Sequence, residues 1–101
     1  MYLEILPVLE TELAMKRRLG ASEDHMLGVQ NNVANMYAHL GQREKAASLM
    51  RDVYSGRLRL SGEESLNTLI AACNYASPLV RLQRFEEAKS LMRKTMPVAR
   101  R

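Results

Sequence analysis

The chain contains only one cysteine, Cys73, so it cannot form an internal disulfide. It also lacks the paired Cys and His spacing that structural zinc sites need, and no metal or other cofactor is expected. We interpret the lone thiol as a small buried hydrophobic group rather than a nucleophile. The default location is a reducing compartment, the cytoplasm, with an organelle interior as the alternative.

Long apolar runs and bulky aromatic residues are also scarce. The first residues, MYLEILPVLETEL, carry the acidic Glu4 and no basic residue, and they contain no long apolar run. They therefore predict neither a secretory signal nor membrane insertion. There is one phenylalanine and no tryptophan, whereas the strong helix formers alanine, leucine, methionine, arginine and glutamate dominate. The composition predicts an all-helical protein.

An excess of positive charge, +4 at pH 7, raises the question of a nucleic-acid partner. Three groups of basic residues fall in the last turns of expected helices, where cations interact favourably with the helix macrodipole. They are Lys16 to Arg18, Arg57, Arg59, Arg100 and Arg101. Aromatic residues interleaved with basic ones, which nucleic-acid surfaces use, are missing. We expect no nucleic-acid partner.

Pairs of residues suited to catalysis are missing as well. His25 is expected in a link and His39 on a helix, and neither has a serine, cysteine or carboxylate that spacing would place beside it. The five glycines form no phosphate-binding pattern. The sequence predicts no catalytic residue, and we do not expect an enzyme.

The dominant feature of the sequence is an internal repeat with an offset of 42 residues. Residues 27–51, LGVQNNVANMYAHLGQREKAASLMR, return as residues 69–93, LIAACNYASPLVRLQRFEEAKSLMR. Laying residues 20–59 over 62–101 gives twelve identities, at Gly20, Leu27, Asn32, Ala34, Leu40, Glu44, Ala46, Ser48, Leu49, Met50, Arg51 and Arg59. A period of about 20 to 50 residues indicates a stacked repeat array.

Within each repeat the apolar residues follow a helical period twice, before and after a break. In the first copy these residues are Leu27, Val33, Ala34, Tyr37, Ala38 and Leu40, and then Ala46, Leu49, Met50 and Val53. Gly41 lies at the break, so each unit is predicted to be a hairpin of two amphipathic helices. Small residues recur at Ala34 and Ala76, and at Ala46 and Ala88, where the two backbones of a hairpin must approach closely.

The pattern predicts five helices in antiparallel hairpins. They cover residues 2–19, about 26–40, 43–60, 66–82 and 84 onward, with links at 20–25 and 61–65. In the first link, Ser22 or Asp24 is available to cap the second helix.

Three residues are expected to disturb this pattern. Gly56 should weaken its helix slightly. Pro7 is interpreted as a marker of the true start of the first helix. Pro78 should bend or end the fourth helix, and it should leave the carbonyl of Asn74 without its usual helical donor.

These residues resemble the tetratricopeptide repeat, a helical hairpin of about 34 residues. The first copy has Ala34 at the first small position, Tyr37 at the aromatic position, Gly41 at the turn, Ala46 at the second small position and Met50 at the large apolar position. The second copy has Ala76, Leu79, Gln83, Ala88 and Met92 at the same positions. Arg43, Gln83 and Pro78 depart from the motif, and Phe85 takes the aromatic position that Arg43 fills in the first copy. The 42-residue period, a Leu-Gly pair and the Asn-x-Ala core are similar to the kinesin light chain type of this repeat.

The resemblance implies an all-α protein, with antiparallel helical hairpins stacked as a short α-solenoid. It covers nearly the whole chain and predicts one repeat domain at residues 1–101. That domain would contain a half repeat at 1–19 and full repeats at 20–61 and 62–101.

The geometry of such arrays predicts where a partner binds, because the first helices of successive hairpins line the concave side. The polar residues expected there are Asn31, Asn32, Asn35, His39, Asn74, Ser77 and Arg81, with Cys73 beside them. In related repeat proteins an asparagine at the place of Asn32 and Asn74 holds the backbone or terminal carboxylate of a bound peptide. The carboxylate version also uses a lysine one turn earlier, where this chain has Gly28 and Ile70, so a C-terminal carboxylate is not favoured. The alternative is that both asparagines brace neighbouring helices within the stack.

Two functions remain open. The first is a protein-interaction module or scaffold that binds a peptide segment of a partner protein in its concave groove. The alternative is a structural subunit, or a fragment of a larger assembly or longer array, without peptide-binding activity of its own. Because the stripe Leu6, Leu9 and Leu13 would lack a neighbour on one side, we expect the chain to self-associate or to dock in a larger assembly.

Overall fold

A computed structural model describes residues 2–18 and 22–99 of the chain. Within these residues it contains five helices and no strand: α1 (Tyr2–Arg18), α2 (Glu23–His39), α3 (Arg43–Ser61), α4 (Leu66–Arg81) and α5 (Phe85–Ala99). The predicted all-helical fold is confirmed. The side chains of Leu13, of Lys16 to Arg18, and residues 100–101 lie outside the described part, as does the beginning of the predicted link at residues 20–25.

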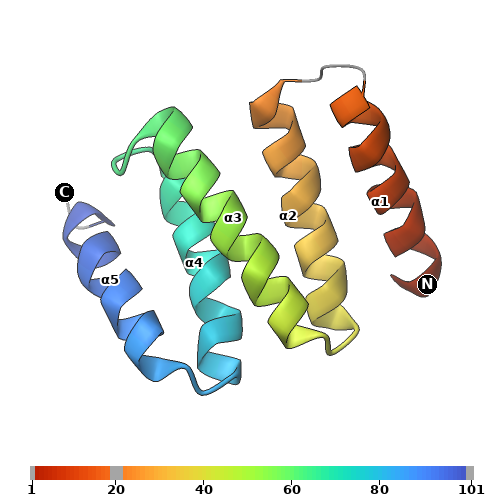
Figure 1. Ribbon diagram of the computed structural model, residues 1–101. Helices are drawn as coiled ribbons and strands as arrows, with labels where there is room; N and C mark the ends of the chain where they lie inside the picture. Colours follow the sequence, from red (N-terminus) through yellow and green to blue (C-terminus); the bar gives the residue numbers. More distant parts are fainter. Residues whose placement is uncertain (1, 19–21, 100–101) are drawn as a thin grey trace.

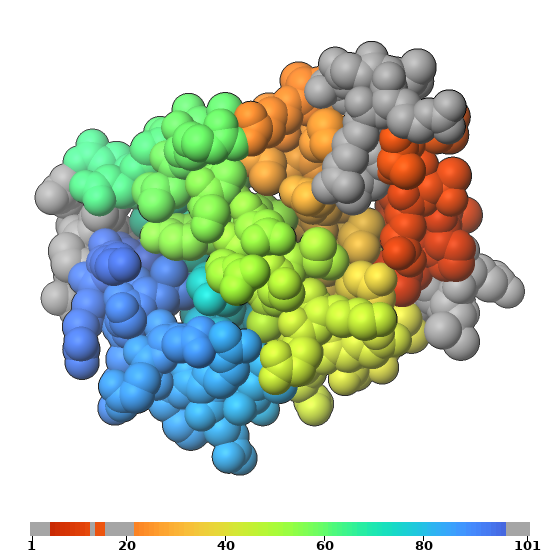
Figure 2. Space-filling view, viewed as in Figure 1, coloured from red at the N-terminus to blue at the C-terminus, as the bar shows by residue number. Residues whose placement is uncertain are grey.

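The helices follow one another side by side, and each runs antiparallel to the helix before it (Figure 1). Each packs against its neighbours in the sequence, and the whole measures 37 × 29 × 16 Å. In this view α3 crosses in front of α4 and α5 lies beside α4, and little of α4 reaches the surface seen in Figure 2. Because each helix runs antiparallel to the one before it, α2 and α4, the first helices of the two hairpins, run in the same direction.

Buried alanines allow the close packing of each hairpin. Ala34 on α2 and Ala46 on α3 are completely buried, as the need for small residues at those places predicts. In the second hairpin Ala88 is buried, but Ala76 is only partly so, and the completely buried alanine of α4 is Ala72. Ala72 contributes to a core cluster with Leu79, Ala88 and Leu91, against which Tyr54, Tyr75, Ala76 and Met92 pack.

Helix α2 begins earlier than the sequence indicates. The hydroxyl of Ser22 accepts a hydrogen bond of 3.2 Å from the backbone N–H of His25, which is the N-cap arrangement. The helix consequently starts at Glu23, and the placement of His25 in a link was wrong. That residue lies in the first turn of α2.

The two hairpin turns have the same backbone geometry although their residues differ. Gly41 has φ 79°, which confirms the expected left-handed turn. Gln83 stands 42 residues later and has φ 60°, the one positive φ of a non-glycine residue in the described chain. In each turn this residue donates to the carbonyl three residues back, and the next residue donates to the carbonyl five residues back. Helices often end with this pair of bonds, which glycine permits at lower steric cost than glutamine.

Pro7 and Pro78 both lie inside helices. Helix α1 starts at Tyr2, five residues before Pro7, so Pro7 does not mark its start. Helix α4 continues through Pro78 to Arg81, and the Pro78 carbonyl accepts a 2.9 Å bond from the N–H of Leu82. The expected early end of α4 is wrong, because one missing donor does not outweigh the packing of the buried Pro78 and Leu79. A bend at Pro78 stays a prediction.

Helix α1 also differs from expectation in the face that it leaves open. Leu6 is buried and Leu9 is half-buried, because this side packs on α2. Among the described side chains of α1, the large apolar ones that are exposed are Ile5, Val8 and Met15, which are spaced along another face of the helix.

Gly56 also has a packing role that the sequence does not indicate, while its weakening effect on the helix stays a prediction. It is buried on α3, and a Cβ atom added there would lie 2.7 Å from Cδ2 and 3.0 Å from Cδ1 of Leu27 on α2. Such distances are shorter than van der Waals contact. The glycine therefore sets how closely α2 and α3 approach.

We expect Gly56→Ala to lower the free energy of unfolding by about 1 kcal/mol. The added methyl group would overpack the contact with Leu27, and this cost should exceed the stabilisation from the higher helix propensity of alanine. Gly28→Ala is the matched control, since an added Cβ there meets nothing within 4 Å and should stabilise by about 0.5 to 1 kcal/mol. Urea denaturation followed by circular dichroism measures both. In a Leu27→Ala background the sign at position 56 should reverse, and a stabilising Gly56→Ala in the unmodified chain would contradict the packing account.

Candidate functional site

A cavity of about 200 Å³ lies between α2 and α4, above the beginning of α3. Five of the seven predicted binding residues line it: Asn35, His39, Asn74, Ser77 and Arg81. Ala38, Arg43, Met50 and Pro78 complete its wall. The helical register explains this grouping, because residues three and four apart lie on the same face and α2 and α4 present their faces to each other.

A second cavity, of about 100 Å³, continues along the same two helices toward their N-termini. Its lining residues are Gly28, Asn31, Val53, Arg57, Asn67, Ile70, Ala71 and Asn74. Asn74 lines both cavities, so they adjoin at this residue. We call the two cavities together the α2–α4 groove, with Arg43 and Arg81 at one end and Arg57 and Ile70 at the other.

The side chains of Asn74 and Asn31 meet where the two cavities join. Nδ2 of Asn74 donates a hydrogen bond of 3.3 Å to Oδ1 of Asn31. This bond braces α4 against α2, as the structural alternative supposed for Asn74, but it leaves the second N–H of Asn74 and both N–H groups of Asn31 for other acceptors.

Asn32 is placed differently from the residues around it. It is exposed and lines neither cavity. Asn32 and Asn74 are 42 residues apart, whereas the hydrogen-bonded pair Asn31 and Asn74 is separated by 43. Because one residue corresponds to about 100° around a helix, Asn31 and Asn32 point in different directions. The sequence alignment therefore pairs Asn74 with Asn32, although the residue that faces α4 is its neighbour Asn31. A role for Asn32 in binding stays a prediction.

Arg43 was missed as a site residue by the sequence reasoning. Its place in the motif could have indicated it, because the cationic Arg43 stands at the position that the aromatic Phe85 fills in the other repeat. Cys73 was also misjudged: its thiol is exposed rather than buried, and it lines neither cavity.

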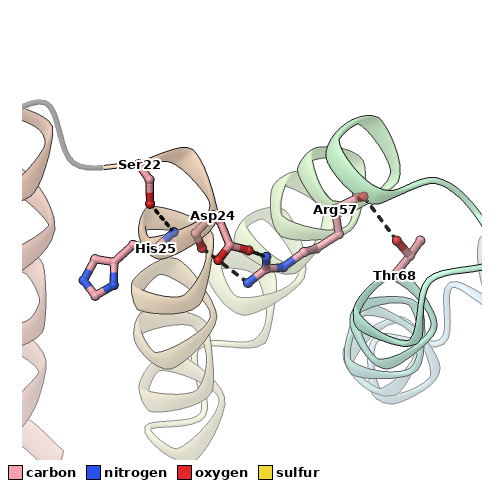
Figure 3. A network of polar contacts seen from close by, with 5 residues as sticks. All are labelled: Ser22, Asp24, His25, Arg57 and Thr68. Atoms are coloured by element: carbon pink, nitrogen blue, oxygen red, sulfur yellow. Dashed lines mark hydrogen bonds and ion pairs between the residues drawn. The ribbon is translucent and has the colours of Figure 1, made fainter.

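A polar network includes Arg57, which lines the smaller cavity (Figure 3). The guanidinium of Arg57 forms an ion pair with the carboxylate of Asp24 and also approaches the Asp24 carbonyl at 3.4 Å. The hydroxyl of the buried Thr68 donates a 3.1 Å hydrogen bond to the carbonyl of Arg57. Arg59 of α3 forms a second ion pair, with the carboxylate of Glu23 on α2. The basic end of α3 thus interacts with the acidic first turn of α2, in addition to its own macrodipole, and it holds the start of α4.

A separate contact ties α1 to the hairpin. The phenol of Tyr37 donates a 3.2 Å hydrogen bond to the carboxylate of Glu10, and Nζ of Lys45 lies 5.4 Å from the centre of the Tyr37 ring. Burial, followed by the negative charge of Glu10 and this hydrogen bond, raises the pKa of Tyr37 above its ordinary value. Because the folded-state pKa is raised, the stabilisation linked to the neutral phenol is present at neutral pH and is lost as the pH rises through that pKa.

Residues 25–101 match the model of the tetratricopeptide repeat family. The match covers more than half of the chain, and the chain belongs to this family. A search of curated proteins found no match. None of the described helices is long and apolar enough to cross a membrane. The same residues hold no group of three or more His, Cys, Asp or Glu that could bind a metal ion.

Proposed function

We propose that the chain is a protein-interaction module that binds an extended segment of a partner protein in the α2–α4 groove. Tetratricopeptide repeats are in general protein–protein interaction modules. The observation that carries the proposal is the gathering of Asn35, His39, Asn74, Ser77 and Arg81 around one cavity. These side chains offer donors and acceptors of the kind that a peptide backbone needs.

The division of the groove supports an extended peptide as the ligand. The larger cavity encloses about 200 Å³ and adjoins the smaller one, of about 100 Å³, at Asn74. Two adjoining cavities suit successive side chains of an extended segment.

Three finer proposals accompany this one. We propose one repeat domain over residues 1–101, supported by the unbroken succession of packed helices. We also propose repeats of the kinesin light chain type, supported by the 42-residue offset. A reducing compartment such as the cytoplasm is supported by Cys73, the single cysteine of the sequence, whose thiol is free and exposed.

To test the groove, peptides from a displayed random library are selected on the whole chain and their affinities are measured. Asn74→Ala should cost about 1 to 3 kcal/mol of binding free energy, because a desolvated peptide group loses its hydrogen bond. The loss for Asn32→Ala should be smaller, since that side chain lies outside both cavities.

Ser90→Ala, at an exposed position on α5, is the matched control and should leave binding unchanged. Circular dichroism must show that each variant keeps its helical content. Equal affinity of the original chain and Asn74→Ala for every selected peptide would remove the groove as the binding site.

A structural role in a larger assembly is the second candidate, and the open apolar face of α1 favours it. Ile5, Val8 and Met15 are 38%, 65% and 54% exposed, and covering such residues contributes about 25 cal/mol per Å². On this account the isolated chain should self-associate or bind a partner through α1. Sedimentation at high micromolar concentration should then show species larger than the monomer, and Val8→Glu should reduce them. A folded monomer under these conditions would contradict self-association.

A further inference from the structure

We propose that the outward face of α1 docks on the outward face of α5 of a second copy of this chain, with the two helices antiparallel. The two faces consist of Ile5, Val8, Glu12 and Met15 on α1, and of Phe85, Lys89, Met92 and Met96 on α5. This inference goes beyond the proposed peptide binding. It rests on the second candidate, a structural role through α1, and it names the surface that covers α1.

Helices α1 and α5 lie at the two ends of the row of helices (Figure 1). Among the described helices, α2, α3 and α4 each pack between two neighbours, whereas α1 packs on α2 and α5 packs on α4. Each end helix therefore has a second side for a neighbour from another molecule. Because the two ends are far apart, one copy can offer α1 to one neighbour and α5 to another.

The outward face of α1 is a narrow stripe. One residue corresponds to about 100° around a helix, so its four residues fall within about 80° of one another. Ile5, Val8 and Met15 are exposed, whereas Leu6 on another side of the helix is buried. The stripe is apolar apart from Glu12, which stands between Val8 and Met15 in the sequence.

The outward face of α5 is a second stripe, in which the four residues fall within about 60° of one another. Phe85 and Met96 are 50% and 44% exposed, and Met92 is half-buried. The stripe adjoins the side of α5 where Leu91 is buried in the core cluster. Its charged residue is the exposed Lys89, which stands between Phe85 and Met92.

The two stripes match in the antiparallel direction. From Ile5 to Met15 and from Phe85 to Met96 they extend about 15 and 16 Å along their helices. Reversing one stripe against the other brings Glu12 opposite Lys89 and sets an apolar residue opposite an apolar residue at the remaining places. In the parallel direction each charge would face an apolar side chain and lose water without gaining a partner.

The order of charges along the two helices favours the same direction. In sequence, α1 carries its glutamates before a basic last turn, and α5 likewise begins with acidic residues, Glu86 and Glu87, and continues with Arg93 and Lys94. Antiparallel docking places the acidic part of each helix beside the basic part of the other, whereas parallel docking would align like charges. Such complementarity fixes the orientation of an interface.

The pair Glu12 and Lys89 is assigned to orientation rather than to most of the affinity. Both residues also interact within their own copy, and Nζ of Lys89 lies 3.7 Å from the carboxylate of Glu86. Exposed ion pairs contribute little to stability, so Lys89 can exchange one partner for another at small cost. The affinity then comes from the apolar residues that both stripes leave in water.

The geometry of the contact determines the kind of assembly. Helices α1 and α5 run in the same direction within one copy, so antiparallel docking turns the second copy over (Figure 1). The two faces differ, which makes the interface heterologous and leaves one face free at each end for a further copy. Since one helix from each copy takes part, the interface is small, below about 1,200 Å², and association should be weak.

A complementation experiment on the whole chain tests the pairing of the two faces. Val8→Glu disrupts the α1 face and Met96→Glu disrupts the α5 face. Each variant alone should sediment as a monomer at high micromolar concentration, where the original chain should form larger species. An equimolar mixture should form a dimer with one copy of each variant, because one intact α1 face and one intact α5 face remain.

Val80→Glu is the matched control, since Val80 is 50% exposed on α4 and belongs to neither stripe. It should associate like the original chain. Circular dichroism must show that each variant keeps its helical content. Peptides selected on the groove should bind Val8→Glu with unchanged affinity, because the two surfaces are separate.

A charge exchange tests the antiparallel register. Glu12→Lys and Lys89→Glu should each lower the association constant about fivefold, because each places two like charges opposite one another. The double variant Glu12→Lys, Lys89→Glu should recover most of the loss, since the pair forms again with reversed signs.

The possible failures are distinguishable. Association of the original chain without dimer formation in the mixture would overturn this inference and leave self-association through α1 in place. A double variant that associates no better than its single variants would overturn the antiparallel register. A monomeric original chain would overturn this inference together with self-association, whereas the proposed peptide binding would be unaffected.

Discussion

Leu79→Ala is expected to lower the free energy of unfolding by about 3 kcal/mol, within the range of about 2 to 5 kcal/mol found for leucine truncation in protein cores. Leu79 is completely buried, and it is the largest side chain with that degree of burial in the described chain. It belongs to the cluster that joins α4 to α5. Because small domains have total stabilities of about 5 to 15 kcal/mol, the variant should lose a large part of its margin.

The cavity left by truncation explains the size of this effect. The cluster that contains Leu79 also includes Ala72 and Ala88, whose side chains are too short to fill the space. The stacked rings of Tyr54 and Tyr75, whose centroids lie 6.3 Å apart, pack against this cluster. Lost contacts with such neighbours are regained only in part by relaxation.

Urea denaturation followed by circular dichroism measures the loss at Leu79. Leu66→Ala is the matched control, since Leu66 lies on the same helix with 69% of its surface exposed and should cost less than about 0.5 kcal/mol. Similar losses for the two variants would mean that α4 does not depend on this cluster.

Ala46→Leu is the second variant with a large expected effect, and it should destabilise the fold by about 2 to 3 kcal/mol. Ala46 and Ala34 are both completely buried on the packed helices α3 and α2. A leucine at position 46 adds three carbon atoms where the exposed surface is 0%, so α2 and α3 would have to separate. The separation would also displace Met50 and Arg43, which line the larger cavity.

This geometry makes a combined measurement informative. Ala46→Leu should lower both the free energy of unfolding and the affinity for peptides selected on the groove. Ser48→Leu, an exposed position on the same helix, is the control and should change neither by more than about 0.5 kcal/mol. Full stability of Ala46→Leu would show that the hairpin tolerates a wider separation than its alanines indicate.

The number of helices and the nature of the turns could be predicted from the sequence because they depend on local properties. Apolar spacing identified each helix, and Gly41 indicated the left-handed turn that it adopts. The matching turn at Gln83 could not be recognised in this way, since glutamine rarely takes a positive φ. There the packing of α4 on α5 imposes the conformation of the turn.

The candidate site was predictable in part for the same reason. Helical periodicity placed Asn35 and His39 on one face, and Asn74, Ser77 and Arg81 on another, and the structure brings both faces to one cavity. Arg43 could not be assigned to the site because it belongs to a different helix. Its approach to Arg81 depends on how α3 crosses between α2 and α4.

The sequence by itself determined the helical repeat, its 42-residue offset and the need for alanine at Ala34 and Ala46, because period and side-chain size are properties of single helices. The tertiary structure alone decided which residues meet between helices. It placed Gly56 against Leu27, joined Asn74 to Asn31 rather than to Asn32, and carried α4 through Pro78. Such contacts depend on the rotation and separation of neighbouring helices. These are set by the packing of whole interfaces, in which many small energy differences add up.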